Sequence, residues 1–181
     1  DKIMKTKILA PRFIFVGTTL LVAAFSRLLP HLPNVTPVAA MALFGGAYLS
    51  NKRLAVVLPL LAMLLSDGLM QLINGQGFHN TMLYVYAGFV LTSFIGIAIS
   101  KRIGVKSVLA GSLLSSVLFF LITNFGVWAA GPFVGEKQLG LMEVYTLGIP
   151  FFAYSLLGDL FFNGLLFGAF QLAQKRITAL V

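Results

Sequence analysis

The chain has 181 residues, of which 59% are hydrophobic and 10% charged, and it contains no cysteine. Soluble domains average about 25% charged residues, and a soluble globule of this size has too small an interior to bury so much apolar surface. The composition therefore predicts an integral membrane protein and leaves no length for a separate soluble catalytic or nucleotide-binding domain. The absence of cysteine excludes disulfides, thiolate metal ligands and a cysteine nucleophile.

The net charge is +8, from 13 Lys and Arg against 5 Asp and Glu. In a soluble protein this excess would suggest nucleic acid as a partner. In a membrane protein, basic residues instead collect in the cytoplasmic loops. We therefore expect the lipid bilayer as the partner of the basic residues, and no nucleic acid.

Charge-poor apolar stretches predict an all-α bundle of six transmembrane helices that forms a single domain over residues 1–181. The predicted spans, in chain order, are 12–29, 35–50, 54–73, 81–99, 107–129 and 146–173. The second span has 16 residues, which extend about 24 Å as a helix, less than the ~30 Å hydrocarbon core of a bilayer. It is therefore interpreted either as a crossing helix or as a re-entrant segment.

The distribution of basic residues favours a second span that crosses. In that topology 11 of the 13 Lys and Arg are cytoplasmic and two, Arg27 and Lys137, are outside. If the span does not cross, the counts become five inside and eight outside, against the positive-inside bias. The cytoplasmic set is Lys2, Lys5, Lys7, Arg12, Lys52, Arg53, Lys101, Arg102, Lys106, Lys175 and Arg176.

With six crossings both termini are cytoplasmic, and we expect a multi-pass protein of the bacterial cytoplasmic (inner) membrane. A signal peptide is not expected, because no small-residue cleavage site follows the first apolar run.

Three charged residues are predicted at membrane depth or at its edge: Arg27, Asp67 and Asp159. An ionised group there is costly unless it is paired or faces a wet cavity, so each is a candidate functional residue. Two structural alternatives stay open. Arg27 can extend its charge to the outer interface, and either aspartate can be its internal counter-ion.

The outer loops and outer helix ends are rich in amides, aromatic residues and histidines. Asn124 lies four residues before Trp128, so both share one helix face. We expect a binding site in which Arg27 meets an anionic group, amides orient the ligand and aromatic side chains cover an apolar ring. The candidate substrate-binding residues are Arg27, His31, Asn34, Asp67, His79, Asn80, Tyr84, Asn124 and Trp128. His31 and His79 have no third ligand at a recognisable spacing, so no metal and no other cofactor is expected.

Small residues form a ribbon along the second span, with small residues four apart at Thr36 and Ala40 and again at Ala42 and Gly46. Such spacing allows close helix packing in membranes. The ribbon predicts either packing within the bundle or a surface for a partner subunit.

Two stretches carry a resemblance to a known family. Residues 27–47 read RLLPHLPNVTPVAAMALFGGA and residues 119–128 read FFLITNFGVW, with 149–152 and 158–160 completing the pattern. Together they resemble a bacterial family of six-span membrane proteins of unknown function. That family is in turn distantly similar to the substrate-binding S-components of energy-coupling factor (ECF) vitamin transporters.

The S-component resemblance implies a bundle that binds a vitamin-like micronutrient from the outside and docks on a membrane coupling subunit driven by ATPases. S-components often present two alanines four apart on their first helix for docking, whereas this chain has Thr19 and Ala23 there. A solitary carrier, or docking through the second span, therefore stays open.

The expected function is uptake of a small organic solute, and the alternative is a non-catalytic accessory or assembly subunit of a larger membrane complex. An enzyme is not expected. Intramembrane aspartyl proteases carry Gly-x-Gly-Asp at one of their paired aspartates, and here Leu156 replaces the first glycine before Asp159.

Overall fold

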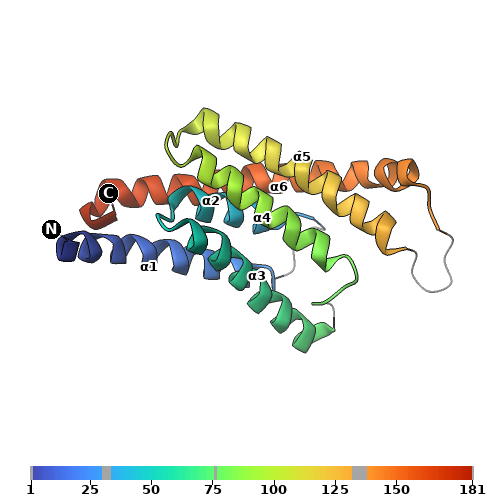
Figure 1. The fold of residues 1–181 in the computed structure, drawn as a ribbon, viewed down its shortest axis with the longest axis horizontal. Helices are drawn as coiled ribbons and strands as arrows, with labels where there is room; N and C mark the ends of the chain where they lie inside the picture. The colour runs from blue at the N-terminus through green and yellow to red at the C-terminus, as the bar shows by residue number, and fades with distance from the viewer. Residues whose placement is uncertain (1, 30–33, 76, 132–137, 181) are drawn as a thin grey trace.

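The computed structural model describes residues 2–29, 34–75, 77–131 and 138–180, without the side chains of 2–10 and 179. These residues form six α-helices and no strand, so the all-helical class is confirmed (Figure 1). The helices are α1 (Lys2–Ser26), α2 (Val38–Tyr48), α3 (Lys52–Asn74), α4 (Met82–Ile99), α5 (Val105–Ala130) and α6 (Leu141–Arg176), followed by the 3₁₀ turn η1 (Thr178–Leu180).

Four of these helices, α3, α4, α5 and α6, are long and apolar enough to cross a membrane. The apolar part of α1, Pro11–Ser26, and the whole of α2 are shorter. The predicted second span, 35–50, is therefore too long: α2 has 11 residues and extends only about 16 Å. It begins after Pro37, because a proline disfavours helical geometry in the residue before it, and it ends where Leu49 becomes extended.

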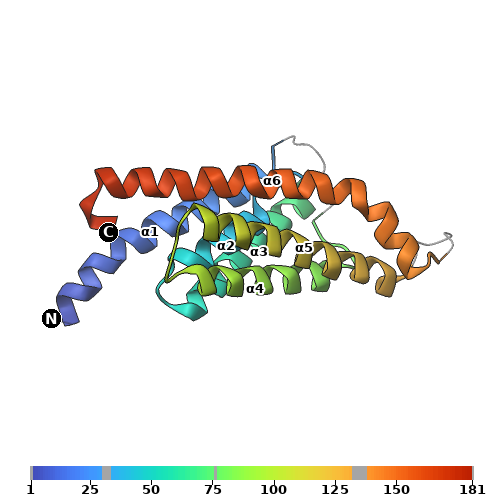
Figure 2. The same cartoon turned by 90° about the horizontal axis from the view of Figure 1, so that it is seen from above.

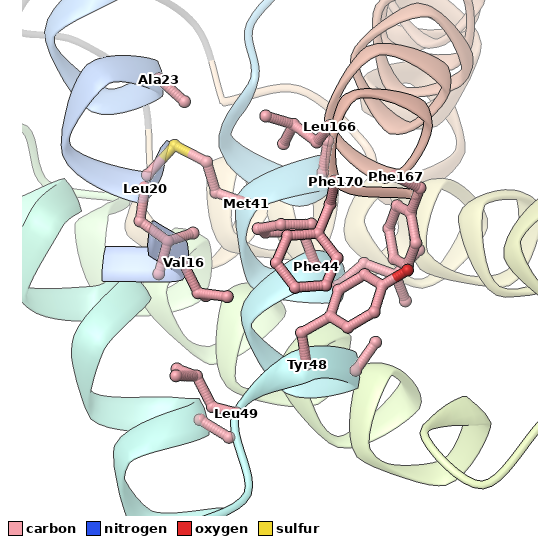
Figure 3. Close-up of a cluster of buried hydrophobic side chains, with 14 of the residues drawn as sticks. Val16, Leu20, Ala23, Met41, Phe44, Tyr48, Leu49, Leu166, Phe167 and Phe170 are labelled. Carbon is pink, nitrogen blue, oxygen red and sulfur yellow. The ribbon is translucent and has the colours of Figure 1, made fainter. Parts of the chain in front are cut away.

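The short helix α2 lies at the centre of the bundle. All of its residues are buried, and it packs against each of the other five α-helices. Phe44 of α2 makes edge contacts with Tyr48, Phe167 and Phe170, at ring-centroid distances of 5.0, 5.4 and 5.7 Å (Figure 3). Val16 and Leu20 of α1 close the other side of this core. The apolar ribbon predicted for the second span is therefore the centre of the protein's own core.

The close crossing of α2 and α4 depends on two glycines. A Cβ atom on Gly46 would overlap the carbonyl oxygen of Ser93, and one on Gly96 would overlap that of Leu43. The two glycine Cα atoms therefore face each other across the crossing, and no larger residue fits at either position without moving a helix.

The helices run alternately up and down, which sorts the connections to two ends of the bundle. Both termini, the α2–α3 turn and the α4–α5 turn lie at one end, on the left of Figures 1 and 2. The α3–α4 and α5–α6 connections lie at the other end. We name the first the basic end, because the helix termini and the α4–α5 turn there carry Lys52, Arg53, Lys101, Arg102, Lys175 and Arg176.

The glycine crossing gives a direct stability test. We expect Gly46→Ala and Gly96→Ala each to lower the free energy of unfolding by about 1–3 kcal/mol, the usual cost of overpacking a core. The measurement is thermal unfolding of the purified protein in lipid nanodiscs. Gly164→Ala and Gly168→Ala are the matched helix controls, because a Cβ atom there meets nothing within 4 Å, and alanine favours a helix more than glycine does. Equal melting temperatures for all four variants would contradict the crossing.

Candidate functional site

Arg27 and Asp67 form a buried ion pair. Arg27 follows the last residue of α1, and its Nη1 atom donates to Oδ1 of Asp67 on α3 at 2.6 Å. The same nitrogen also contacts the hydroxyl oxygen of Ser66 and the sulfur of Met63. Tyr86 of α4 donates from its hydroxyl to Oδ2 of Asp67 at 2.8 Å. The two side chains are only 14% and 6% exposed, so this cluster joins α1, α3 and α4 inside the bundle.

The ion pair accounts for two of the three charges predicted at membrane depth. Asp67 has both of its carboxylate oxygens occupied, one by Arg27 and the other by Tyr86. Its partner Arg27 has its positive charge balanced within the chain. Asp67, rather than Asp159, is therefore the internal counter-ion of Arg27, which was one of the alternatives that the sequence left open.

Asp159, the third charge, lies beside a cavity of about 230 Å³ between α5 and α6. Its side chain is buried, and Oδ2 accepts a hydrogen bond from the hydroxyl of Ser116 at 2.7 Å. The cavity combines polar side chains with phenylalanine rings. Its lining residues are Asn34, Ser116, Phe119, Phe120, Thr123, Asn124, Val127, Gly148, Phe151, Phe152, Ser155 and Asp159. We call this the α5–α6 cavity.

Two serines of α5 form hydrogen bonds with polar residues of α6, at the inner part of the cavity and next to it. Ser116 reaches Asp159, and Ser112, one turn earlier, accepts a hydrogen bond from Nδ2 of Asn163 at 2.9 Å. Because positions four apart share a helix face, two serines of α5 meet an acid and an amide of α6 in register. Hydrogen bonds of this kind hold helices together where packing gains little from the hydrophobic effect.

Backbone features of α6 open and border the cavity. Pro150 lies inside this helix, and α6 bends in the orange part that contains it (Figure 2), as expected where a proline removes a helix hydrogen bond. Gly148 leaves space for the side chain of Asn124, and Gly158 admits the backbone at Val35. The absence of a side chain at these glycines therefore brings α5 and the segment before α2 against α6.

Two of the predicted substrate-binding residues, Asn34 and Asn124, line the cavity. Asn34 has a positive φ of 63°, a conformation that asparagine adopts more readily than most residues. Asn124 donates from Nδ2 to the carbonyl of Phe120 at 2.8 Å. These two amides reach one site from the segment before α2 and from α5.

The other candidates lie elsewhere. Tyr84 packs on Gly126 and on the ring of Phe125, and Trp128 packs on the same ring from the next turn of α5. His79 and Asn80 are exposed, and Nδ1 of His79 lies 2.9 Å from the hydroxyl of Thr81. His31 is outside the described residues. The nine candidates therefore do not form one pocket.

The residues of the cavity that sequence reasoning missed are serines, a threonine and phenylalanines. Ser116, Thr123 and Ser155 carry hydroxyls, and Phe119, Phe120, Phe151 and Phe152 carry the rings. The spacing of Ser116 and of Asp159 within their helices gives no sign that they meet. The pairs Phe119-Phe120 and Phe151-Phe152 line the cavity, but α6 carries another pair, Phe161-Phe162, that does not, so such pairs alone do not mark the lining.

The ribbon proposed for partner packing is mostly inside the protein. Ala40, Ala42 and Gly46 are buried against neighbouring helices, and Thr36 is partly exposed. In this conformation they leave no free surface for another subunit at the three buried positions. Among the described residues, no group of three or more His, Asp or Glu lies close enough to hold a metal ion.

The fold and site define a helical bundle of the membrane type, with a cavity of aromatic and polar residues between two membrane-length helices. Residues 7–180 match a family described as a family of unknown function (DUF6580), and the chain belongs to that family. Neither a curated protein nor a solved structure shows significant similarity to the chain.

The ion pair gives a second testable prediction. Arg27→Met leaves Asp67 buried without its cation, so we expect a loss of about 3–5 kcal/mol in the free energy of unfolding. Arg27→Met combined with Asp67→Asn removes both charges and should recover a large part of that loss. The measurement is a double-mutant cycle of unfolding free energies. If the two substitutions were simply additive, the pair would not be coupled and its assignment would be wrong.

Proposed function

We propose that this protein is a membrane uptake protein that binds a small organic solute in the α5–α6 cavity. The observation that carries the proposal is the cavity itself, where a buried carboxyl, hydroxyls and amides lie beside four phenylalanine rings. Ligand sites are typically apolar hollows with a few placed polar groups. At about 230 Å³, this one suits a solute smaller than a drug-sized molecule.

The proposed topology has six crossing helices with both termini cytoplasmic, in the bacterial inner membrane. The gathering of basic helix ends at one end of the bundle supports this orientation. The shortness of α2 is compatible with it, because α2 is covered by other helices, so its backbone ends need not meet lipid.

Access from the outer side follows from this orientation. The cavity is bordered by Val127 and Gly148, which lie toward the ends of α5 and α6 opposite the basic end. It extends inward to Asp159, near the middle of α6. A solute entering from the outside would therefore reach a carboxyl at mid-depth.

The proposal includes the likeness to ECF S-components, with a membrane coupling subunit and its ATPases as the partner. The small six-helix bundle is the feature that supports it. The protein is proposed to have no catalytic role, because Asp67 and Asp159 sit in separate clusters with different partners, one with Arg27 and Tyr86 and the other with Ser116.

A second candidate function, an accessory subunit of a larger membrane complex, is favoured by a different feature. Toward the basic end, α5 and α6 border a groove of about 180 Å³ lined by Gly104, Gly164 and Gly168. Nothing lies within 4 Å of a Cβ atom built on any of these glycines. Small residues four apart, such as the exposed Gly164 and the partly exposed Gly168, suit close approach of another membrane helix.

Solute binding is tested by filling the cavity. A panel of thiamine, pyridoxine, nicotinamide, riboflavin, biotin and pantothenate is added to the protein in nanodiscs, and thermal stability is measured. A ligand at about 100 times its Kd stabilises the folded state by about 2.7 kcal/mol. We expect at least one compound to stabilise the wild-type protein and Ser155→Phe to abolish that effect, because Ser155 lines the cavity.

The matched control is Ala153→Phe, which adds the same side chain to an exposed position of α6 two residues away. It should retain the ligand effect. Stable copurification with the same large subunits, together with no stabilisation by any compound, would favour the accessory-subunit function instead.

A further inference from the structure

The two membrane-depth aspartates differ in how their charge is balanced. Asp67 has Arg27 at 2.6 Å. Within the residues whose side chains are described, no Lys, Arg or His lies within salt-bridge distance of Asp159, whose hydrogen-bond partner is the hydroxyl of Ser116. Arg27, the one arginine predicted outside, therefore balances Asp67. Asp159 lies beside a cavity and has no cation next to it.

A buried carboxyl without a cation has two ways to avoid the cost of a lone charge in an apolar interior. It can hold a proton, or it can pair with a cation brought by a ligand. A single hydroxyl does not replace a counter-ion, because burial removes most of the stabilisation that water gives to an ion. Asp159 is only 6% exposed, so the cavity is the place from which a ligand can reach it.

Several donors of the cavity's other polar groups are already used within the protein. The hydroxyl of Thr123 donates to the carbonyl of Phe119, and Ser116 has Asp159 and the carbonyl of Ser112 as acceptors. One N–H of Asn124 is used by the carbonyl of Phe120. The amides of Asn34 and Asn124 and the hydroxyl of Ser155 still offer donors to the cavity. The acceptors left over are Oδ1 of Asp159, Oδ1 of Asn124 and the lone pairs of Thr123. A ligand with several N–H donors would satisfy them together.

The aromatic rings of the cavity also favour a positively charged ligand. Phe119, Phe120, Phe151 and Phe152 line it, and the rings of Phe120 and Phe152 lie 4.9 Å apart between centroids. The faces of aromatic rings attract cations, more strongly where water is excluded. Rings beside a carboxyl therefore suit a positive group attached to an apolar body.

From these contacts we propose that the α5–α6 cavity recognises a small organic cation, an amine or a protonated ring nitrogen on a compact apolar body, with Asp159 as its counter-ion. This inference rests on the proposed function and specifies its substrate class. It reverses the ligand charge expected from Arg27, whose charge Asp67 already balances. Where the lone acid holds a proton, binding breaks that O–H bond and releases the proton to water. The carboxylate and the ligand cation form an ion pair in place of a lone acid.

Three probes of one size and different charge test the proposal: benzylammonium, benzyl alcohol and benzoate. Each is titrated against the wild-type protein in nanodiscs of neutral lipid at one pH, with thermal stability as the readout. The Ser155→Phe variant supplies the baseline for partition into lipid. We expect benzylammonium to bind at least about tenfold more tightly than benzyl alcohol, and benzoate to bind worst.

Asp159→Asn keeps the shape of the side chain and removes its charge, so the preference for benzylammonium over benzyl alcohol should fall to about one. Glu143→Gln is the control, since it removes an exposed carboxylate from the same helix, and it should keep the preference.

Equal binding of benzylammonium and benzyl alcohol by the wild-type protein would overturn the charge assignment while solute binding in the cavity stands. A preference that survives Asp159→Asn would also overturn it. Absence of binding by all three probes and by the whole vitamin panel would instead remove the proposed function itself. The comparison of probes on the wild-type protein decides the matter even if Asp159→Asn does not fold.

Discussion

The cost of an ionised group in an apolar interior organises this structure. With 10% charged residues, the chain places few charges among its helices, and each of those must be balanced where water cannot balance it. Arg27, Asp67 and Tyr86 form one closed cluster in which every charge has its partner. Asp159 does not belong to that cluster and has a serine hydroxyl beside a cavity. Asp67, whose charge is balanced by Arg27, is therefore a structural charge. Asp159, which has no cation beside it, is the candidate binding charge.

Packing around α2 fixes where both acids lie. The buried short helix contacts the other five helices, and its crossing with α4 leaves no space at Gly46 and Gly96. Gly158 similarly brings Val35, in the segment before α2, against α6 one residue before Asp159. The side chains that line the cavity therefore stand on segments that are held by close contacts at glycines. A site built on close helix packing can hold a small ligand in a defined orientation.

The sequence predicted much of the fold and less of the site. Six charge-poor stretches correspond to the six helices, because apolar length is a strong signal in a chain with so few charges. The length of α2 was overestimated, since the apolar run continues past the residues that are helical. Of the nine candidate binding residues, Asn34 and Asn124 line the same cavity, whereas Ser116, Ser155 and the four phenylalanines were not among the candidates. With 17 Phe spread over the chain, composition does not tell which rings face a cavity.

The pairing of Arg27 with Asp67 rather than Asp159 depends on which helices are neighbours, and no pattern within one helix encodes that.

Chemical labelling of the two acids distinguishes a balanced carboxyl from one without a cation. A hydrophobic carbodiimide modifies carboxyl groups that are protonated and reachable from the membrane or from a cavity, and peptide mass spectrometry identifies the modified residue. An acid paired with arginine and tyrosine should resist the reagent, and an acid without a cation should react. We predict modification at Asp159, with Asp67 unmodified in the folded protein. Modification of Asp67 without modification of Asp159 would contradict this prediction, because Asp67 would then be the acid without a balancing cation.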